Sequence, residues 1–173
     1  DLGLYELYNR YPEDPSRNYG QIWLDNSDHE EAIMSRFFLS HRGDDYSIGL
    51  RAGPNGYHNW ATNTPIQQFI DAFEMSDGSK FDWNNPKHAS APYENRDPRF
   101  YTTVLYPGAR FQNDDVTEIT YAHTGYALRK YSVFDETTGN PPANVSDIKD
   151  GQSETNYMVI RYAEILLSYA EAQ

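Results

Sequence analysis

The chain has 173 residues, enough for one domain with a sizeable core. Its formal net charge of −12 argues against a nucleic-acid partner, because binding a phosphate backbone requires a clustered basic surface. The absence of cysteine excludes disulfides and thiolate metal sites, and no apolar run reaches the roughly 20 residues of a membrane span.

The first third of the chain predicts one helix, one ambiguous element and a long loop. Apolar residues at i, i+3, i+4 and i+7 predict a helix over residues 2–11, which Pro12 ends. Residues 33–39 fit either a strand or a helix that follows a capping box at 27–30, and their periodicity does not separate the two. Residues 41–60 carry Gly and Pro in place of an apolar pattern and predict a loop.

A short helix is the expected element of the middle region. Thr64 as N-cap and Pro65 at the first helical position predict a helix that runs to Phe73. Asp77-Gly78 predicts a turn, and residues 82–86 predict another loop. The apolar stripe of the helix consists of Ile66, Phe69, Ile70 and Phe73.

Residues 96–99 read Arg-Asp-Pro-Arg and precede an expected strand. Asp97 as N-cap and Pro98 at the first helical position predict a single turn, flanked by Arg96 and Arg99. The β-branched residues of 102–106 then predict a strand that a Pro-Gly turn closes.

The last third is polar and turn-rich until its final helix. A short strand is expected within 124–131, and residues 157–173 carry the strongest helical pattern of the chain. Arg161 and Glu164 can pair on this helix at i, i+3 spacing. The helix is apolar over most of its circumference and lacks an end signal, so we expect a piece of a longer protein whose other elements bury it.

Four segments of the chain together resemble one family. They are "TPIQQFIDAFEMSDG" (64–78), "NRDPRFYTTVLYPG" (95–108), "TGYALRKY" (124–131) and "VIRYAEILLSYAEAQ" (159–173). The ordered set resembles the SusD/RagB family of outer-membrane nutrient-binding lipoproteins of Bacteroidetes-type bacteria. The resemblance is close over about residues 60–173 and loose over the first 60 residues.

The resemblance implies a mainly α-helical fold with long irregular loops and a few short strands, part of an α/α superhelix of tetratricopeptide-like helix pairs. Residues 1–173 would then be a fragment of one SusD-like domain. Residues 1–60 would supply a helix and a loop-rich region, and 61–156 the ligand-side loops, a short helix and short strands. Residues 157–173 would begin a buried tetratricopeptide-like helix.

The resemblance also implies a function without chemistry. Family members stand at the cell surface of the outer membrane, held by an N-terminal lipid that lies outside this chain. They deliver oligosaccharides, or peptides in some members, to a SusC-like TonB-dependent transporter. Because ligands differ between members while residues 96–99 belong to the shared framework, we interpret Arg96 and Arg99 as a structural clamp that bonds carbonyls or carboxylates.

Aromatic and amide side chains on loops are the candidate ligand contacts, because sugars stack on rings and bond planar polar groups. The first set is Tyr57, His58, Asn59 and Trp60. The alternative is that Trp60 fills the core beneath the following helix, and both interpretations stay open. The second set is Trp83 with Asn84, for which an asparagine-stabilised turn is the alternative.

No metal or cofactor is expected. Calcium would find oxygen ligands at 25–28 or 114–115, but solvated loop acids are the ordinary role of such residues. A glycoside hydrolase would need two facing carboxylates, for which pairs such as Glu74 and Asp82 can be named without any support from spacing. A tetratricopeptide-type protein-binding scaffold is disfavoured by the long aromatic loops.

Overall fold

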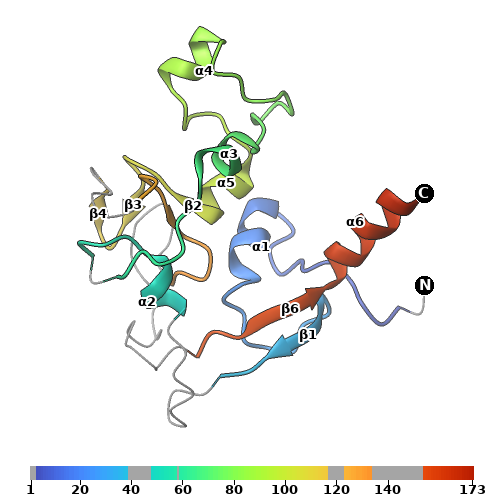
Figure 1. Ribbon diagram of the computed structural model, residues 1–173. Helices are drawn as coiled ribbons and strands as arrows, with labels where there is room; N and C mark the ends of the chain where they lie inside the picture. The colour runs from blue at the N-terminus through green and yellow to red at the C-terminus, as the bar shows by residue number, and fades with distance from the viewer. Residues whose placement is uncertain (1–2, 39–47, 58, 117–122, 134–153) are drawn as a thin grey trace.

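The computed structural model describes residues 3–38, 48–57, 59–116, 123–133 and 154–173 (Figure 1). Within these ranges the helices are α1 Pro15–Gln21, α2 Ile48–Ala52, α3 Gln67–Asp71, α4 Pro86–Ser90, α5 Pro98–Thr103 and α6 Tyr162–Ala172. The strands are β1 Ala32–Arg36, β2 Val104–Leu105, β3 Arg110–Phe111, β4 Asp114–Asp115, β5 Ala127–Leu128 and β6 Tyr157–Arg161. Helical residues outnumber strand residues, so the expected mainly helical class with long loops and short strands is confirmed. The tetratricopeptide-like superhelix stays a prediction.

Three helices begin with the same local device, a proline preceded by a capping side chain. Asp14, Asn85 and Asp97 are the N-caps of α1, α4 and α5, and each accepts a hydrogen bond from the backbone N–H two or three residues on. Proline fits the first helical position because its missing N–H would have no helical partner there. The predicted turn at Asp97-Pro98 is therefore confirmed, and it extends into a six-residue helix.

The longest strand pair joins two distant parts of the chain. β1 runs antiparallel to β6, with Ala32 opposite Arg161 and Arg36 opposite Tyr157, and two irregularities interrupt the register (Figure 1). Residues 32–36 are thus a strand, which resolves the ambiguity of this segment. The helix predicted from residue 157 is wrong over its first five residues, because β1 offers them a sheet partner that no local pattern reveals.

Two further helix predictions are corrected. Residues 3–11 form no helix; instead the Glu6 amide donates to the Glu30 carbonyl at 3.2 Å, and the segment lies along the chain before β1. The helix expected from Thr64 begins only at Gln67, with Ile66 as an N-cap that lacks a side-chain hydrogen bond. Thr64 and Pro65 therefore precede α3 rather than start it. The predicted loop at 41–60 also contains α2.

Among the residues that the structure describes, the core consists of three small clusters. The first gathers Ala61, Leu105, Ala109, Phe111, Val116 and Ala127, with Tyr57 and Tyr106 packed against it. The second gathers Ile70, Phe100, Val104 and Tyr126. The third gathers Tyr8, Ile22 and Trp23. Each fully buried aromatic or branched side chain contributes roughly 1.5–3 kcal/mol.

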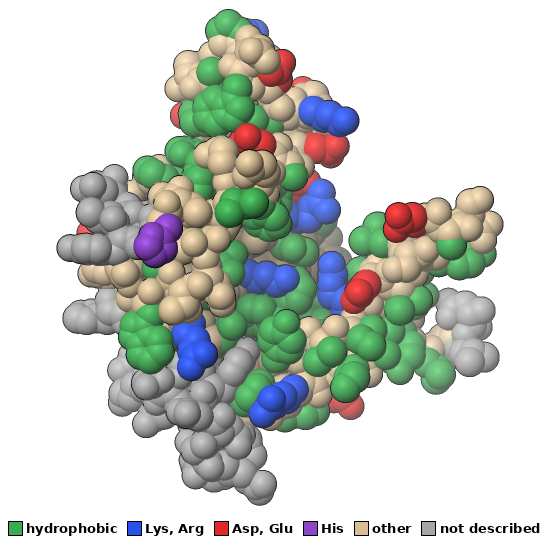
Figure 2. Space-filling model, in the orientation of Figure 1, with side chains coloured by type: hydrophobic (Ala, Val, Ile, Leu, Met, Phe, Trp, Pro, Cys, Tyr) green, Lys and Arg blue, Asp and Glu red, His purple; other side chains and the backbone are tan. Residues whose placement is uncertain are grey.

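α6 stands apart from these clusters. It has no buried residue, and Leu167 and Tyr169 are 68% and 65% exposed. Figure 2 shows the helix standing away from the body, with hydrophobic side chains on its visible face. No helix within the described part of the chain has the length and apolarity to cross a membrane.

Candidate functional site

The loop that carries the first candidate set is fastened to α2 by backbone hydrogen bonds. The Trp60 amide donates to the Leu50 carbonyl at 2.9 Å, and the Thr62 amide donates to the Arg51 carbonyl at 2.9 Å. The Thr62 hydroxyl donates to the same Arg51 carbonyl at 3.1 Å. These bonds hold Trp60 beside the last turn of α2 without any help from the tryptophan side chain.

Asn59 forms the inner side of this loop. It is 5% exposed, and its Nδ2 donates to the Gly49 carbonyl at 3.0 Å. A Cβ on Gly53 would lie only 2.5 Å from Asn59 Cγ, so glycine is required at 53 for the two segments to approach. The amide of Asn59 is thus used within the protein, and the structure does not place it as a ligand contact.

The β3–β4 hairpin, from another part of the sequence, contacts the loop and supports it. Gln112 and Asn113, both with positive φ, form the turn between β3 and β4. Gln112 Nε2 donates to the Tyr57 carbonyl at 2.8 Å, and the Tyr57 ring meets the Phe111 ring edge-on at 5.7 Å. Burial, followed by the neighbouring Asp114 carboxylate, raises the pKa of Tyr57. Tyr57 is therefore a half-buried support for the loop.

Trp60 is the member of the set that faces solvent. Trp60 is 45% exposed, which excludes the alternative in which its side chain fills the core beneath α3. The next residue, Ala61, has φ +46°, a strained conformation for a residue with a Cβ. The backbone thus bends sharply so that Ala61 enters the core while Trp60 turns outward. His58, the remaining member, lies outside the described residues.

The second candidate, Trp83, is also at the surface, with 46% exposure. Its Nε1 donates to Asp71 Oδ2 on α3 at 3.0 Å, and the Phe81 ring meets it edge-on at 5.0 Å. Asn84 bonds Asp82 through both its backbone amide and its Nδ2, at 2.8 and 3.0 Å. Trp83 therefore has an open ring held in place by carboxylate contacts, and Asn84 serves the turn.

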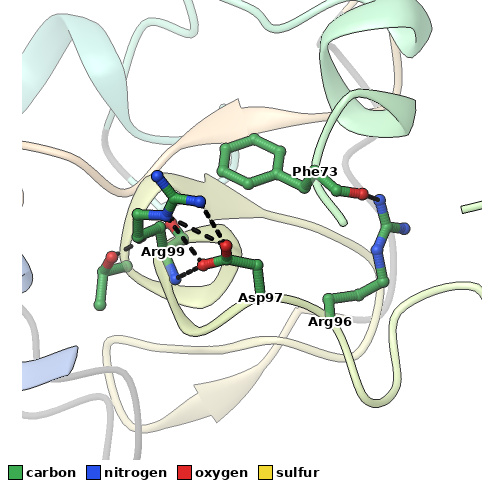
Figure 3. Close-up of polar contacts among 5 residues, drawn as sticks. Phe73, Arg96, Asp97 and Arg99 are labelled. Carbon is green, nitrogen blue, oxygen red and sulfur yellow. Dashed lines mark hydrogen bonds and ion pairs between the residues drawn. The ribbon is translucent and has the colours of Figure 1, made fainter. Parts of the chain in front are cut away.

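Arg96 reaches three backbone carbonyls from a buried position. It is 2% exposed, and its two Nη atoms donate to the carbonyls of Ile70, Phe73 and Pro92 at 2.6, 2.8 and 2.7 Å. Figure 3 shows the bond to Phe73. Its guanidinium also lies over the rings of Phe81 and Phe100. Burial lowers the pKa of Arg96 below its ordinary value. The side chain joins the end of α3 to the loop before α5, a geometry that suits a clamp.

Arg99 behaves differently from Arg96. Its guanidinium bonds the Asp97 carboxylate of its own turn, and the arginine side chain is 59% exposed (Figure 3). Hydrogen bonds from Arg99 hold the pKa of the Asp97 carboxyl below its usual range. Asp97 meanwhile caps α5 by accepting from the Arg99 amide at 2.8 Å.

The predicted pairing of Arg161 with Glu164 is wrong. Arg161 is the last residue of β6, and its Nη1 bonds Glu31 Oε1 at 2.7 Å. The second oxygen of Glu31 accepts from the Tyr8 amide, at 2.6 Å. Because Arg161 lies in a strand, its distance along the sequence from Glu164 no longer brings the two side chains onto one helical face. The buried Glu31 instead ties β6 to the N-terminal segment.

The acidic loops named for calcium are used by protein groups. Asp25 accepts from the Tyr8 hydroxyl at 2.9 Å and from the Ser27 amide at 2.8 Å. Asp115 pairs with Arg110 at 3.0 Å. Over the described residues, no three His, Asp or Glu side chains gather into a set that could hold a metal ion.

Three residues important to these sites were not predicted from the sequence. Arg51 stands beside Trp60, Gln112 supports the loop, and Asp71 holds Trp83. None carries a local signal, since each meets its partner through the folding of separate segments. A pocket of about 350 Å³ between α1, α5 and β3, lined by Tyr101, Tyr106 and Arg110 among others, was also not predicted.

Comparison with known proteins gives a consistent result. The profile of the SusD family matches residues 20–173. A SusD-like protein from Bacteroides fragilis NCTC 9343 superposes with a TM-score of 0.67 at 27% identity, over 97% of this chain and 36% of that chain. A SusD-like carbohydrate binding protein from the same organism gives a TM-score of 0.63 at 22% identity, over 90% of this chain and 35% of that one.

The chain thus spans about a third of the length of both solved proteins. At 22% identity, the second likeness shows the fold alone. Among curated proteins, none matches this sequence.

Proposed function

Since this chain belongs to the SusD family, we propose that it forms part of a cell-surface protein that binds oligosaccharides and delivers them to a TonB-dependent transporter of the outer membrane. The family match over residues 20–173 confirms the resemblance that the four sequence segments indicate. The description of the second solved relative as carbohydrate binding supports a glycan rather than a peptide ligand.

The observation that carries the proposal is the presentation of Trp60. An indole ring offers a flat apolar face on which the C–H groups of a pyranose can stack. Holding such a ring at the surface costs the protein part of the burial energy that the side chain could supply. Here the backbone bonds to α2, the glycine at 53 and the strained Ala61 all fix the ring outward. Such pre-organisation favours binding because less freedom is lost when a ligand arrives.

Trp83 is the second stacking surface of the proposal. Its ring is equally exposed, and its Nε1 is fixed by Asp71, so it too keeps one orientation. A glycan bound by stacking and hydrogen bonds needs no catalytic group, and the proposed protein releases its ligand unchanged. The proposal includes membrane attachment through a lipid and a SusC-like transporter as the receiving partner.

Isothermal titration of the full-length protein with a panel of neutral and acidic oligosaccharides, and with peptides, tests the proposal. We expect heat on addition of at least one glycan class and no release of reducing ends over hours. Trp60→Ala should weaken binding about 5- to 150-fold, because stacking on an aromatic ring is worth roughly 1–3 kcal/mol in comparable contacts.

Phe37→Ala is the matched control, since it removes an aromatic residue that is 62% exposed just after β1. It should leave glycan affinity unchanged. If only peptides bind, the proposed glycan ligand is wrong and the ligand class is peptide. Measurable turnover of a glycan would contradict the non-catalytic part of the proposal. A large fall in melting temperature with Trp60→Ala would make that residue structural.

A further inference from the structure

An arginine lies over the exposed ring of Trp60, at a distance longer than that of direct stacking. The Cζ of Arg51 is 5.9 Å from the centroid of the Trp60 ring. By contrast, Arg17 Cζ is 3.9 Å from the centroid of the Tyr11 ring, the distance of a guanidinium stacked on a ring face. At 5.9 Å the guanidinium of Arg51 is not stacked directly on the indole.

The backbone fixes this neighbourhood. The carbonyl of Arg51 accepts from both the amide and the hydroxyl of Thr62, while the Leu50 carbonyl accepts from the Trp60 amide. These hydrogen bonds hold the backbone of Arg51 and the backbone of Trp60 at a constant separation. A ligand that needs a ring and a cation at once finds them already placed.

The charge of Arg51 is not used by another side chain within the described part of the protein. Arg10, Arg99, Arg110 and Arg161 each pair with a carboxylate. The contact that the structure gives the guanidinium of Arg51 is the one with Trp60. This surface arginine lies next to an exposed tryptophan in a chain of net charge −12. The Asp115 carboxylate on the supporting hairpin is already occupied by Arg110.

The other exposed tryptophan has the opposite electrostatic surroundings. Trp83 Nε1 bonds the carboxylate of Asp71, and Asp82 is the preceding residue, where it accepts from Asn84. These carboxylates would repel an anionic ligand at Trp83 and leave it suited to neutral sugars. The two rings therefore differ in the charge beside them and not only in position.

We propose that Trp60 and Arg51 form a subsite for an acidic sugar, with the pyranose ring stacked on the indole and its carboxylate bound by the guanidinium. Arginine suits this task because its planar fork can donate two parallel hydrogen bonds to a carboxylate. The proposal rests on the proposed glycan-binding function, and it adds uronic acid residues as the ligand class. Trp83 takes no part in this selection.

The test compares two trisaccharides, trigalacturonate and neutral galactotriose, by titration calorimetry with the full-length protein at low and at high salt. We expect the acidic sugar to bind about tenfold or more tightly at low salt, since a hydrogen bond to a charged group exceeds a neutral one by about that factor. High salt should reduce the difference, because it screens exposed charges.

Arg51→Gln should remove the preference for trigalacturonate and leave galactotriose binding as it was. Arg17→Gln is the matched control, because it removes another surface arginine in contact with an aromatic ring, and it should retain the preference. Trp60→Ala should weaken both sugars.

The outcomes separate this inference from the function on which it rests. Equal binding of the two sugars, or a preference that survives Arg51→Gln, overturns the acidic subsite while glycan binding stands. Binding of galactotriose alone does the same. Failure of both sugars and of the wider oligosaccharide panel overturns the proposed function together with the subsite.

Discussion

Replacing Arg96 by lysine tests whether this residue holds the framework together. The guanidinium spans three carbonyls that belong to the end of α3 and to the loop before α5. A lysine ammonium keeps the charge but lacks the planar fork that reaches both segments. We therefore expect Arg96→Lys to lose two of the three hydrogen bonds.

The magnitude follows from the contacts. A hydrogen bond to a charged group contributes about 1.5–3 kcal/mol, so the loss of two would cost about 3–6 kcal/mol. Burial lowers the pKa of Arg96, which means that desolvation opposes the charge and offsets part of this gain. We expect a net loss near the lower bound, about 3 kcal/mol, against a total of roughly 5–15 kcal/mol for a folded domain.

Arg99→Lys is the control, because Arg99 is an exposed partner of Asp97 within one turn and should cost less than about 1 kcal/mol. Guanidinium denaturation followed by tryptophan fluorescence compares the two variants. Hydrogen exchange of amides 70–75 and 93–97 locates the effect, since a protein of several units need not unfold in one step. Equal denaturation midpoints for both variants, with unchanged exchange, would refute the clamp.

Two other substitutions probe the packing described above. Gly53→Ala places a Cβ only 2.5 Å from Asn59 Cγ, and such overpacking costs about 1–3 kcal/mol. We expect a lower melting temperature and weaker glycan binding. If both values stay unchanged, the close packing of Gly53 against Asn59 is wrong. Burial, and then the charge of Arg161, lowers the pKa of Lys130 from 10.5 to about 8. The unfolded chain therefore holds this proton up to higher pH than the folded protein does, so stability should rise as pH increases from 8 to 10.5, by up to about 1.4 kcal/mol per pH unit. Denaturation at pH 7 to 10.5 should show this gain in the native protein and not in Lys130→Met; parallel curves would disprove it.

Local signals were sufficient to predict the short-range features of the fold. Asp97-Pro98 marks the start of α5 because cap and proline act within one turn, and Asp77-Gly78 forms its turn for the same kind of reason. The helical pattern of residues 2–11 failed because the Glu6 amide bonds a carbonyl 24 residues away. A helical period of 3.6 residues in the sequence does not reveal that a distant carbonyl will bond a backbone amide of the segment.

The candidate site was only partly predictable for the same reason. An aromatic residue on a loop indicated Trp60, and its exposure was decided by the strained Ala61 and by bonds to α2. Asn59 looked like a ligand contact because amides bind hydroxyls, yet its amide bonds Gly49 inside the protein. The role of Arg51 depends on the approach of two segments, and no spacing in the sequence encodes that approach.

The pairing of β1 with β6 has a consequence for how the protein folds. Roughly 120 residues separate the two strands along the chain, and closing a loop of that length costs about 4 kcal/mol in chain entropy before any pairing energy is returned. On the ribosome, at about 5–20 residues per second, β1 would wait on the order of ten seconds for its partner. During that interval its edge, with Ile33 and Met34, can pair with another chain. Assembly of this sheet is therefore the step at which slow folding and aggregation compete most directly.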